Sequence, residues 1–191
     1  MGIEFELKYR ANPEIQAQIA NTGTWHTISM ETTYYDTPTR GLSQRQFTLR
    51  RRLENGISIC TLKAPAGALA RGEWETECGS IEEAVPALCK LGCPEILPAL
   101  VAEGLVEACG ARFTRQAATV EQNGAVLEIA LDRGYLFAGE KQLPLCEVEV
   151  ELKAGSQAAA VAYAKALAEK YGLIPEPGSK FRRALALRED A

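Results

Sequence analysis

Histidine is nearly absent from this sequence of 191 residues, in which His26 is the only one. Most Ser-His and Cys-His mechanisms need a histidine base beside the nucleophile, so they are poor hypotheses for this chain. Its six cysteines are scattered without CxxC spacing, which argues against a zinc site or a disulfide framework and favours small buried side chains for most of them. Any chemistry must therefore be done by carboxylates, cations and water.

The sequence also lacks long apolar runs and an excess of basic residues. No apolar stretch approaches the roughly 18 residues that cross a bilayer, and charge begins at Glu4, so we expect a cytoplasmic protein with no membrane partner. With 21 basic against 25 acidic side chains, the overall charge offers no reason to bind nucleic acid. The length and the hydrophobic content of 47% predict one domain, residues 1–191, with a sizeable core.

What the sequence does contain is alternation. Residues 3–10 alternate one charged with one apolar side chain, which is the period of a strand with two different faces. A helix is predicted at 13–20, where Asn12 and Pro13 form a helix start, and another at 156–171, which ends at Gly172. Short helices are predicted within 80–110. Further strands are predicted at 27–36, 47–53, 57–63, 73–78, 112–122, 125–131, 135–138 and 145–152.

Charged residues occupy every second position in many of these strands. A solvated outer face explains such a pattern in any single strand. Here, however, arginine pairs and glutamate pairs are segregated by strand, which favours an enclosed lining with separate zones for anions and cations. We therefore predict an α+β fold in which eight antiparallel strands close into a β-barrel with flanking helices, whose polar interior must hold water, ions or a ligand.

Particular motifs carry a family resemblance. Glu4-Phe-Glu6-Leu-Lys8 forms an ExExK pattern. Further matches follow in order at residues 34–38, 49–52, 61–63, 71–73, 128–132, 146–152 and 179–180. Together they resemble the CYTH superfamily, the triphosphate tunnel metalloenzymes, and are most similar to the catalytic half of bacterial inorganic triphosphatases.

The resemblance implies roles for thirteen side chains. Carboxylates two residues apart on one strand face suit Mg²⁺ or Mn²⁺, and two such ions are expected. The implied metal ligands are Glu4, Glu6, Glu147 and Glu149, with Glu151 and Asp132 as additional ones. The implied substrate-binding residues are Lys8, Arg50, Arg52, Lys63, Arg115, Lys180 and Arg183. The implied catalytic residues are Glu4, Glu6, Lys8 and Lys63.

Alternatives remain open for several of these residues. The glutamates are also explained as exposed carboxylates balanced by lysine or arginine on the neighbouring strand. Arg112 could replace Arg115, and Arg182 could replace Arg183, if the register shifts by a residue or more, and Arg183 could equally be solvated. Arg71 and Glu73 are expected to buttress the lining through an ion pair.

The implied activity is metal-dependent hydrolysis of inorganic triphosphate to diphosphate and phosphate. Thiamine triphosphate or a nucleoside triphosphate is the second hypothesis, and cyclisation of ATP is the third. A hypothesis of a different class is a non-catalytic module that binds polyphosphate or nucleotide. In each case the partner is a small molecule, and the chain is expected to be a monomer or a homodimer.

Overall fold

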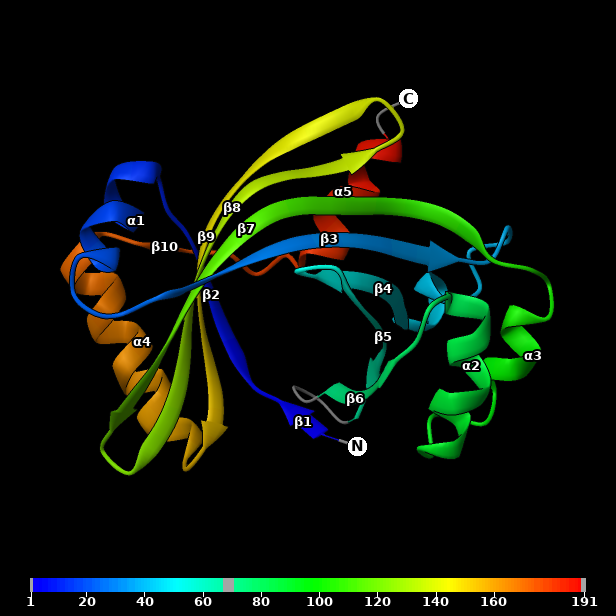
Figure 1. Ribbon diagram of the computed structural model, residues 1–191, viewed down its shortest axis with the longest axis horizontal. Helices are drawn as coiled ribbons and strands as arrows, with labels where there is room; N and C mark the ends of the chain where they lie inside the picture. Colours follow the sequence, from blue (N-terminus) through cyan, green and yellow to red (C-terminus); the bar gives the residue numbers. More distant parts are fainter. Residues whose placement is uncertain (1, 67–70, 190–191) are drawn as a thin grey trace.

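The computed structural model describes residues 2–66 and 71–189, within which ten antiparallel strands form one curved sheet (Figure 1). The strands are β1 Gly2–Glu4, β2 Glu6–Arg10, β3 His26–Asp36, β4 Thr48–Glu54, β5 Ile57–Pro65, β6 Arg71–Glu77, β7 Val106–Gln122, β8 Ala125–Ala138, β9 Lys141–Ala154 and β10 Ile174–Pro175. Their order across the sheet is β1-β6-β5-β4-β3-β7-β8-β9-β2-β10. The charged alternation of the sequence is therefore presented on one continuous sheet.

The helices begin where the sequence supplies caps. They are α1 Pro13–Ala20, the 3₁₀ turn η1 Ser43–Arg45, α2 Ile81–Lys90, α3 Leu97–Val101, α4 Gln157–Tyr171 and α5 Lys180–Glu189. The side chains of Asn12, Ser80 and Ser156 accept hydrogen bonds from main-chain N–H groups in the first turns of α1, α2 and α4. In the described part of the chain, no helix has the length and apolar character needed to cross a membrane.

The predicted closed eight-stranded barrel is wrong. Across the described residues the hydrogen-bonded order starts at β1 and ends at β10, so the ladder is open, and it has ten strands. The N-terminal segment, predicted as one strand, changes partner at Phe5: β1 pairs with β6, whereas β2 pairs with β9. The other edge of β2 is taken by the two-residue strand β10. Because β2 is already paired on both sides, it cannot also form a ladder with β6.

One face of the sheet is apolar and is covered by helices. Helices α2 and α3 pack on β4, β5 and β6 through a cluster that includes Leu49, Leu62 and Leu88. Helices α1 and α4 pack on β2, β8 and β9 at the opposite end of the molecule (Figure 1) through Ile19 and Val150, among others. Each of these side chains is buried, and burial of apolar area is the main stabilising contribution to such layers. The opposite face of the same strands is left to the charged residues.

Helix α5 was not predicted, and its first residues, Lys180, Phe181 and Arg182, become part of the cavity lining on the charged face. Its Phe181 packs against Tyr34 of β3 with ring centroids 5.2 Å apart. Both belong to a third buried cluster with residues of β7 and β8. The main-chain N–H of Arg182 donates to the Ser179 hydroxyl at 3.1 Å, which starts the helix. This packing brings the first turn of α5 to the charged face of the sheet.

Most predicted elements are confirmed, with one informative merger. Helix α1 has the predicted bounds, and both Asn-Gly pairs, at 55–56 and 123–124, have the positive φ values of tight hairpin turns. The strands predicted at 125–131 and 135–138 are a single strand, β8. Gly134 lies inside it, where an added Cβ would come 2.1 Å from the main-chain oxygen of Arg112. Glycine is present there because β7 crosses too closely for any side chain.

Candidate active site

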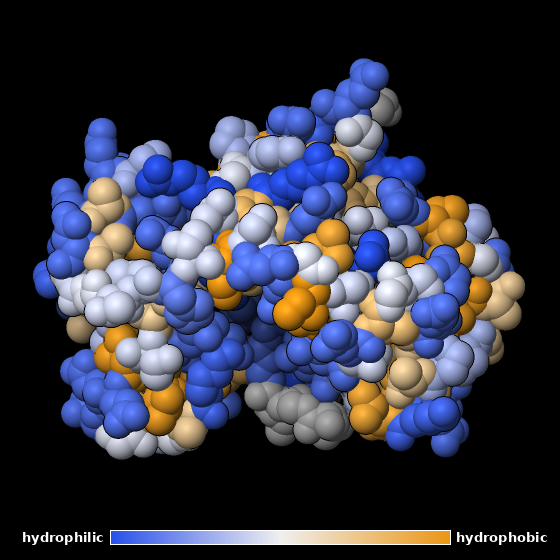
Figure 2. Space-filling model, in the orientation of Figure 1, coloured by the Kyte–Doolittle hydropathy of each residue, from blue (hydrophilic) through white to orange (hydrophobic). Residues whose placement is uncertain are grey.

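The charged face of the sheet encloses a cavity of about 580 Å³. Figure 2 shows a hollow bordered by hydrophilic side chains near the middle of the view. Among the described residues, nine basic side chains line the cavity: Lys8, Arg50, Arg52, Lys63, Arg71, Arg115, Lys153, Lys180 and Arg182. Eight acidic side chains line it as well: Glu4, Glu6, Glu54, Glu73, Glu75, Glu128, Glu149 and Glu151. The lining is thus densely charged and almost neutral as a whole.

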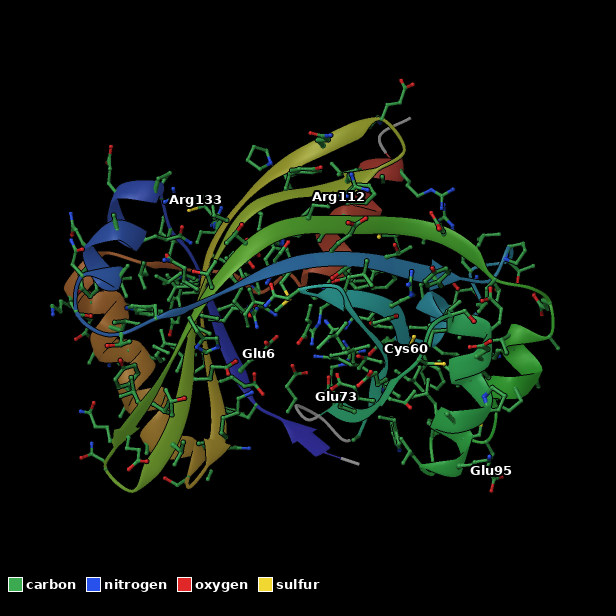
Figure 3. All side chains as sticks on the ribbon, in the orientation of Figure 1. Glu6, Cys60, Glu73, Glu95, Arg112 and Arg133 are labelled. Carbon is green, nitrogen blue, oxygen red and sulfur yellow. The ribbon has the colours of Figure 1, made fainter. Side chains whose placement is uncertain are left out.

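Strand periodicity explains why these side chains converge. On β4, Arg50 and Arg52 face the cavity. The alternate residues face the other way: Leu49 is fully buried under α2 and α3, and the Nε of Arg51 donates a hydrogen bond of 2.8 Å to the Ser58 hydroxyl. The same alternation distributes Glu6 and Glu73 to the cavity side, as Figure 3 shows. Adjacent strands therefore add their charged residues to one lining.

Carboxylates form a row across three neighbouring strands. Glu6 of β2 lies opposite Glu151 of β9, and Glu151 lies opposite Glu128 of β8. Like charges directly opposite each other destabilise a sheet unless a cation offsets them. The Lys8 ammonium lies 3.0 Å from Glu6. Burial raises the pKa of the Glu151 carboxyl, an effect that the nearby Lys153 ammonium opposes. The row is therefore rich in oxygen donors and only partly neutralised.

The opposite side of the cavity, which we call the cationic wall, is formed by β4, β5 and β6. Lys63 lies 2.5 Å from Glu4 and 3.4 Å from Glu73, and Arg50 lies 3.9 Å from Glu73. Arg52 contacts Glu54. Burial, together with repulsion from Arg50, lowers the pKa of Arg52 to about 10. These cations are crowded and only loosely neutralised.

Two donors of the cationic wall lack partners. The Nε atoms of Arg50 and Arg52 are buried and form no hydrogen bond with the described residues. A buried N–H without an acceptor is costly, so such groups mark places where a ligand or water accepts. Both guanidinium groups line the cavity. Their free donors are suited to the oxygens of an anion inside it.

A second set of charges, which we call the floor cluster, extends from the cavity lining into the buried layer beneath it. It consists of Asp132, Glu147, Glu149, Arg115, Lys180 and Arg183. Oxygens of the three carboxylates lie within 4.8 Å of one another. The Lys180 ammonium lies 2.8 Å from Asp132, 2.8 Å from Glu147 and 2.5 Å from Glu149. Three cations therefore already neutralise the three acids.

The other two cations complete the floor cluster. Arg115 donates two hydrogen bonds of 2.8 Å to Asp132 and one of 2.5 Å to Glu149. Arg183 contacts Glu147. Burial alone would raise the pKa of Glu149, but Lys180 and Arg115 lower it well below its usual range. Burial alone would lower the pKa of Lys180, but the carboxylates of Asp132, Glu149 and Glu147 raise it. The cluster anchors α5, through Lys180 and Arg183, to β8 and β9.

A glutamine outside the sheet supports this cluster from behind. Gln16 of α1 is buried, and its Nε2 donates to the main-chain oxygens of Asp132 at 2.9 Å and Glu147 at 2.8 Å. Its Oε1 accepts from Arg133 at 3.1 Å. No sequence motif marked Gln16, although its position in the predicted helix is on the same face as buried Ile19.

The structure brings most of the predicted site residues together at the cavity. Those that line it are Glu4, Glu6, Lys8, Arg50, Arg52, Lys63, Arg115, Glu149, Glu151 and Lys180. Asp132 and Glu147 are fully buried and are absent from its lining, as is Arg183. These three side chains pair within the floor cluster instead, Asp132 and Glu147 with Lys180, and Arg183 with Glu147. Roles in binding and catalysis remain predictions for all of these residues.

The structure shows which arginine of each neighbouring pair, Arg112 or Arg115 and Arg182 or Arg183, lines the cavity. Arg115 lines the cavity, whereas Arg112 pairs with Glu31 at 3.0 Å on the outer side of β7 (Figure 3). Arg182 lines the cavity, and Arg183 reaches down to Glu147 instead. Neither Arg112 nor Arg183 is therefore among the described residues that line the cavity.

Several lining residues were missed although the sequence signalled them. Lys153 continues the alternation of Glu147, Glu149 and Glu151 by one more step, and Glu54 does the same after Arg52. Extending each pattern to the end of its strand would have found them.

The donor set fits a hard divalent cation. Every acidic side chain of the lining is a glutamate, and no histidine or cysteine lines the cavity among the described residues. Oxygen donors of this kind suit Mg²⁺ or Mn²⁺ rather than Zn²⁺ or Cu²⁺. Glu4, Glu6 and Glu151 could hold such an ion, and Glu149 could join them if it gave up its contacts with Lys180 and Arg115. Asp132 and Glu147 also hold Lys180 and lie outside the lining.

Comparison with known proteins gives a consistent family. The CYTH domain model matches residues 2–185. A curated relative, the inorganic triphosphatase of Haemophilus influenzae, is 29% identical over 163 residues, which are 80% of this chain and 46% of that protein. The chain thus spans about half the length of this curated relative.

Solved structures share the fold. The PH1819 protein of Pyrococcus horikoshii is 25% identical with a TM-score of 0.68, and the match covers 98% of this chain and 99% of that one. A Hippeastrum protein, described as having a dominant triphosphatase activity, is 16% identical with a TM-score of 0.62 over 98% of this chain and 96% of its own. At that identity the second likeness is one of fold alone.

Proposed function

This chain belongs to the CYTH family, and from that membership we propose that it hydrolyses inorganic triphosphate to diphosphate and phosphate with the help of divalent metal ions. The single observation that carries the proposal is the enclosed cavity, in which a row of glutamates faces a wall of arginine and lysine. The curated relative named inorganic triphosphatase supports the choice of substrate.

The cationic wall would bind the phosphate groups. The free Nε donors of Arg50 and Arg52 are available to phosphate oxygens, and a planar guanidinium can contact two oxygens at once. Lys63 and Lys8 would act as compact positive charges next to them. Holding the chain of phosphates in one orientation, and stabilising the charge that shifts during P–O cleavage, supplies most of the rate in phosphoryl transfer.

The charge of the lining supports a metal requirement. Triphosphate carries about four to five negative charges at neutral pH, since each terminal phosphate ionises near this range. Nine basic side chains against eight acidic ones cannot neutralise that charge. A divalent cation bound by the glutamates would neutralise phosphate charge and orient the attacking water.

We assign the metal to glutamates of the cavity lining, with Glu149 shared between this lining and the floor cluster, rather than to the fully buried Asp132 and Glu147. Glu4, Glu6 and Glu151 line the cavity with Glu149 beside them. Asp132 and Glu147 would instead hold Lys180 and Arg183 in place, so that Lys180 keeps its position at the cavity. This proposal narrows the ligand set expected from the sequence.

The apolar part of the lining favours an inorganic substrate. The aromatic and methionine side chains of the lining, Met30, Tyr34, Phe113 and Phe181, are each at most 9% exposed. Ile28 and Pro177 line the cavity with more exposure, but neither has an aromatic ring for stacking. One side of the Phe113 ring is also taken up by Lys180, whose ammonium lies 5.3 Å from the ring centroid. A base or a thiazole ring needs an accessible apolar surface on which to stack. These four side chains offer little, which ranks thiamine triphosphate and ATP lower.

Phosphate release tests the proposal. Purified protein is incubated with tripolyphosphate, thiamine triphosphate or ATP, each with Mg²⁺, with Mn²⁺ and with excess chelator. We expect release from tripolyphosphate that is fastest of the three and that the chelator abolishes. Tight binding of tripolyphosphate without any release would instead identify a non-catalytic binding module, and cyclic AMP formation from ATP would identify a cyclase.

A further inference from the structure

Lys153 is the cavity-lining lysine that solvent reaches most easily. Its side chain is 42% exposed, against 13% for both Lys8 and Lys63 and 10% for Lys180. It lies near the end of β9, two residues beyond Glu151, and so shares the cavity face of that strand. No sequence motif includes it.

Lys153 bridges two carboxylates of the glutamate row. Its ammonium lies 2.8 Å from Glu151 and 3.6 Å from Glu128, which face each other across β8 and β9. Glu6, the third member of the row, has Lys8 as its partner. Among the described residues, Lys153 is the cation that lies within 4 Å of both Glu128 and Glu151, so its charge is best placed to offset the repulsion between them, while Arg115 attracts Glu128 from farther away.

We propose that Lys153 is a tethered counter-ion, which holds Glu151 and Glu128 while no divalent cation is bound and must leave them when one binds. The inference rests on the proposed function, which assigns Glu151 to the metal. A lysine ammonium is a single charge on a flexible stem, so it can move to solvent with little rearrangement of its surroundings. Lys8 and Lys63 are enclosed and lack that freedom.

The physical consequence is competition. A divalent cation that approaches Glu151 must displace the Lys153 ammonium. The free energy of the Lys153–Glu151 ion pair is lost in that step, and this loss weakens the net binding of the cation. Exposed ion pairs of this kind contribute up to about 1 kcal/mol, which corresponds to at most roughly fivefold in affinity. Removing the charge should therefore tighten the binding of a divalent cation by about two- to fivefold, even without any substrate.

The test measures Mn²⁺ binding without triphosphate. Mn²⁺ is titrated into the full chain and into Lys153→Met, Lys153→Gln and Lys153→Arg, and free Mn²⁺ is followed by electron paramagnetic resonance. The matched control is Lys165→Met, because Lys165 also pairs with a glutamate, Glu169, at 4.0 Å, but lies on α4 outside the cavity. The two neutral variants should bind two- to fivefold tighter, whereas Lys153→Arg and Lys165→Met should match the unmodified chain.

Phosphate release from tripolyphosphate, measured on the same preparations, separates the possible failures. Equal or weaker Mn²⁺ binding by both neutral variants, with hydrolysis retained, overturns the counter-ion role and leaves the proposed function intact. Tighter binding without hydrolysis in any preparation supports the counter-ion role and contradicts the proposed function. Absence of Mn²⁺ binding in every preparation overturns the counter-ion role, and thermal unfolding shows that each variant is folded.

Discussion

The floor cluster and the cationic wall are built from the same kinds of side chain but in different states of completion. In the floor cluster, Lys180 contacts three carboxylates, and Arg115 binds two of them. In the wall, Arg50 and Arg52 line the cavity and retain donors with no partner among the described residues. The Nε of Arg183 in the floor cluster also lacks a partner there, but Arg183 does not line the cavity. Saturated charges hold a structure together, whereas unsatisfied ones are available to a ligand. The floor cluster therefore stabilises the fold around the cavity, whereas the cationic wall is the region proposed to bind the ligand.

The largest expected effect concerns the glutamate row that faces the wall. Glu6→Gln keeps the shape of the side chain and removes its charge, so metal-dependent phosphate release should fall by about 10²–10³-fold, as for loss of one electrostatic contact in a transition state. Thermal unfolding should change little. Full activity in Glu6→Gln would contradict the assignment of this row to the metal.

The next effect tests whether the floor cluster is structural. Lys180→Met leaves buried acids without their shared partner, so the free energy of unfolding should fall by about 3–5 kcal/mol. Lys63→Met is the matched change in the wall, where the lysine meets only two carboxylates, both partly exposed. Its cost should be smaller, about 1.5–3 kcal/mol, as for loss of a hydrogen bond to a charged group. Urea unfolding measures both, and equal losses would remove the distinction between the two regions.

A third change should affect binding and leave stability intact. Arg52→Met removes a crowded cation of the wall, so the KM for triphosphate should rise by about tenfold, the loss expected for a charged contact of roughly 1.5 kcal/mol. Stability should be equal or slightly higher. Arg51→Met is the control, because Arg51 bonds Ser58 on the other face of β4. A similar KM for both variants would argue against phosphate binding by the wall.

The smallest effect is expected outside both regions. Arg112 pairs with Glu31 on the outer side of β7, where both side chains are about half exposed. Arg112→Met should therefore leave phosphate release and thermal unfolding unchanged within error. Loss of activity in this variant would show that the outer face of β7 takes part in the reaction.

Much of the lining could be predicted because strand alternation determines which face a side chain occupies. Glu6 and Arg52 were placed in the cavity by that rule and by the family motifs. Alternation does not specify how deep along the cavity a residue lies, so Asp132 and Glu147 were grouped with the lining although they lie beneath it. Depth is set by α5, and no motif beyond Ser179-Lys180 announced that helix.

The closure of the sheet was the principal error, and its cause is local. The charged alternation of residues 3–10 continues without interruption through Phe5, so nothing in the pattern shows a change of pairing partner. The strand β10 has only two residues, Ile174 and Pro175, which is too short for any periodicity. Pairing that depends on such short contacts is decided by tertiary packing rather than by local sequence.

The change of partner at Phe5 has a mechanical consequence. Glu4 belongs to β1, which pairs with β6, and Glu6 belongs to β2, which pairs with β9. Only Phe5 separates the two glutamates along the backbone. Two residues of extended chain span at most about 7 Å, so covalent bonds limit how far these two borders can move apart. The backbone around Phe5 therefore keeps the width of the cavity nearly constant between these two strands, even though no hydrogen-bonded ladder joins them.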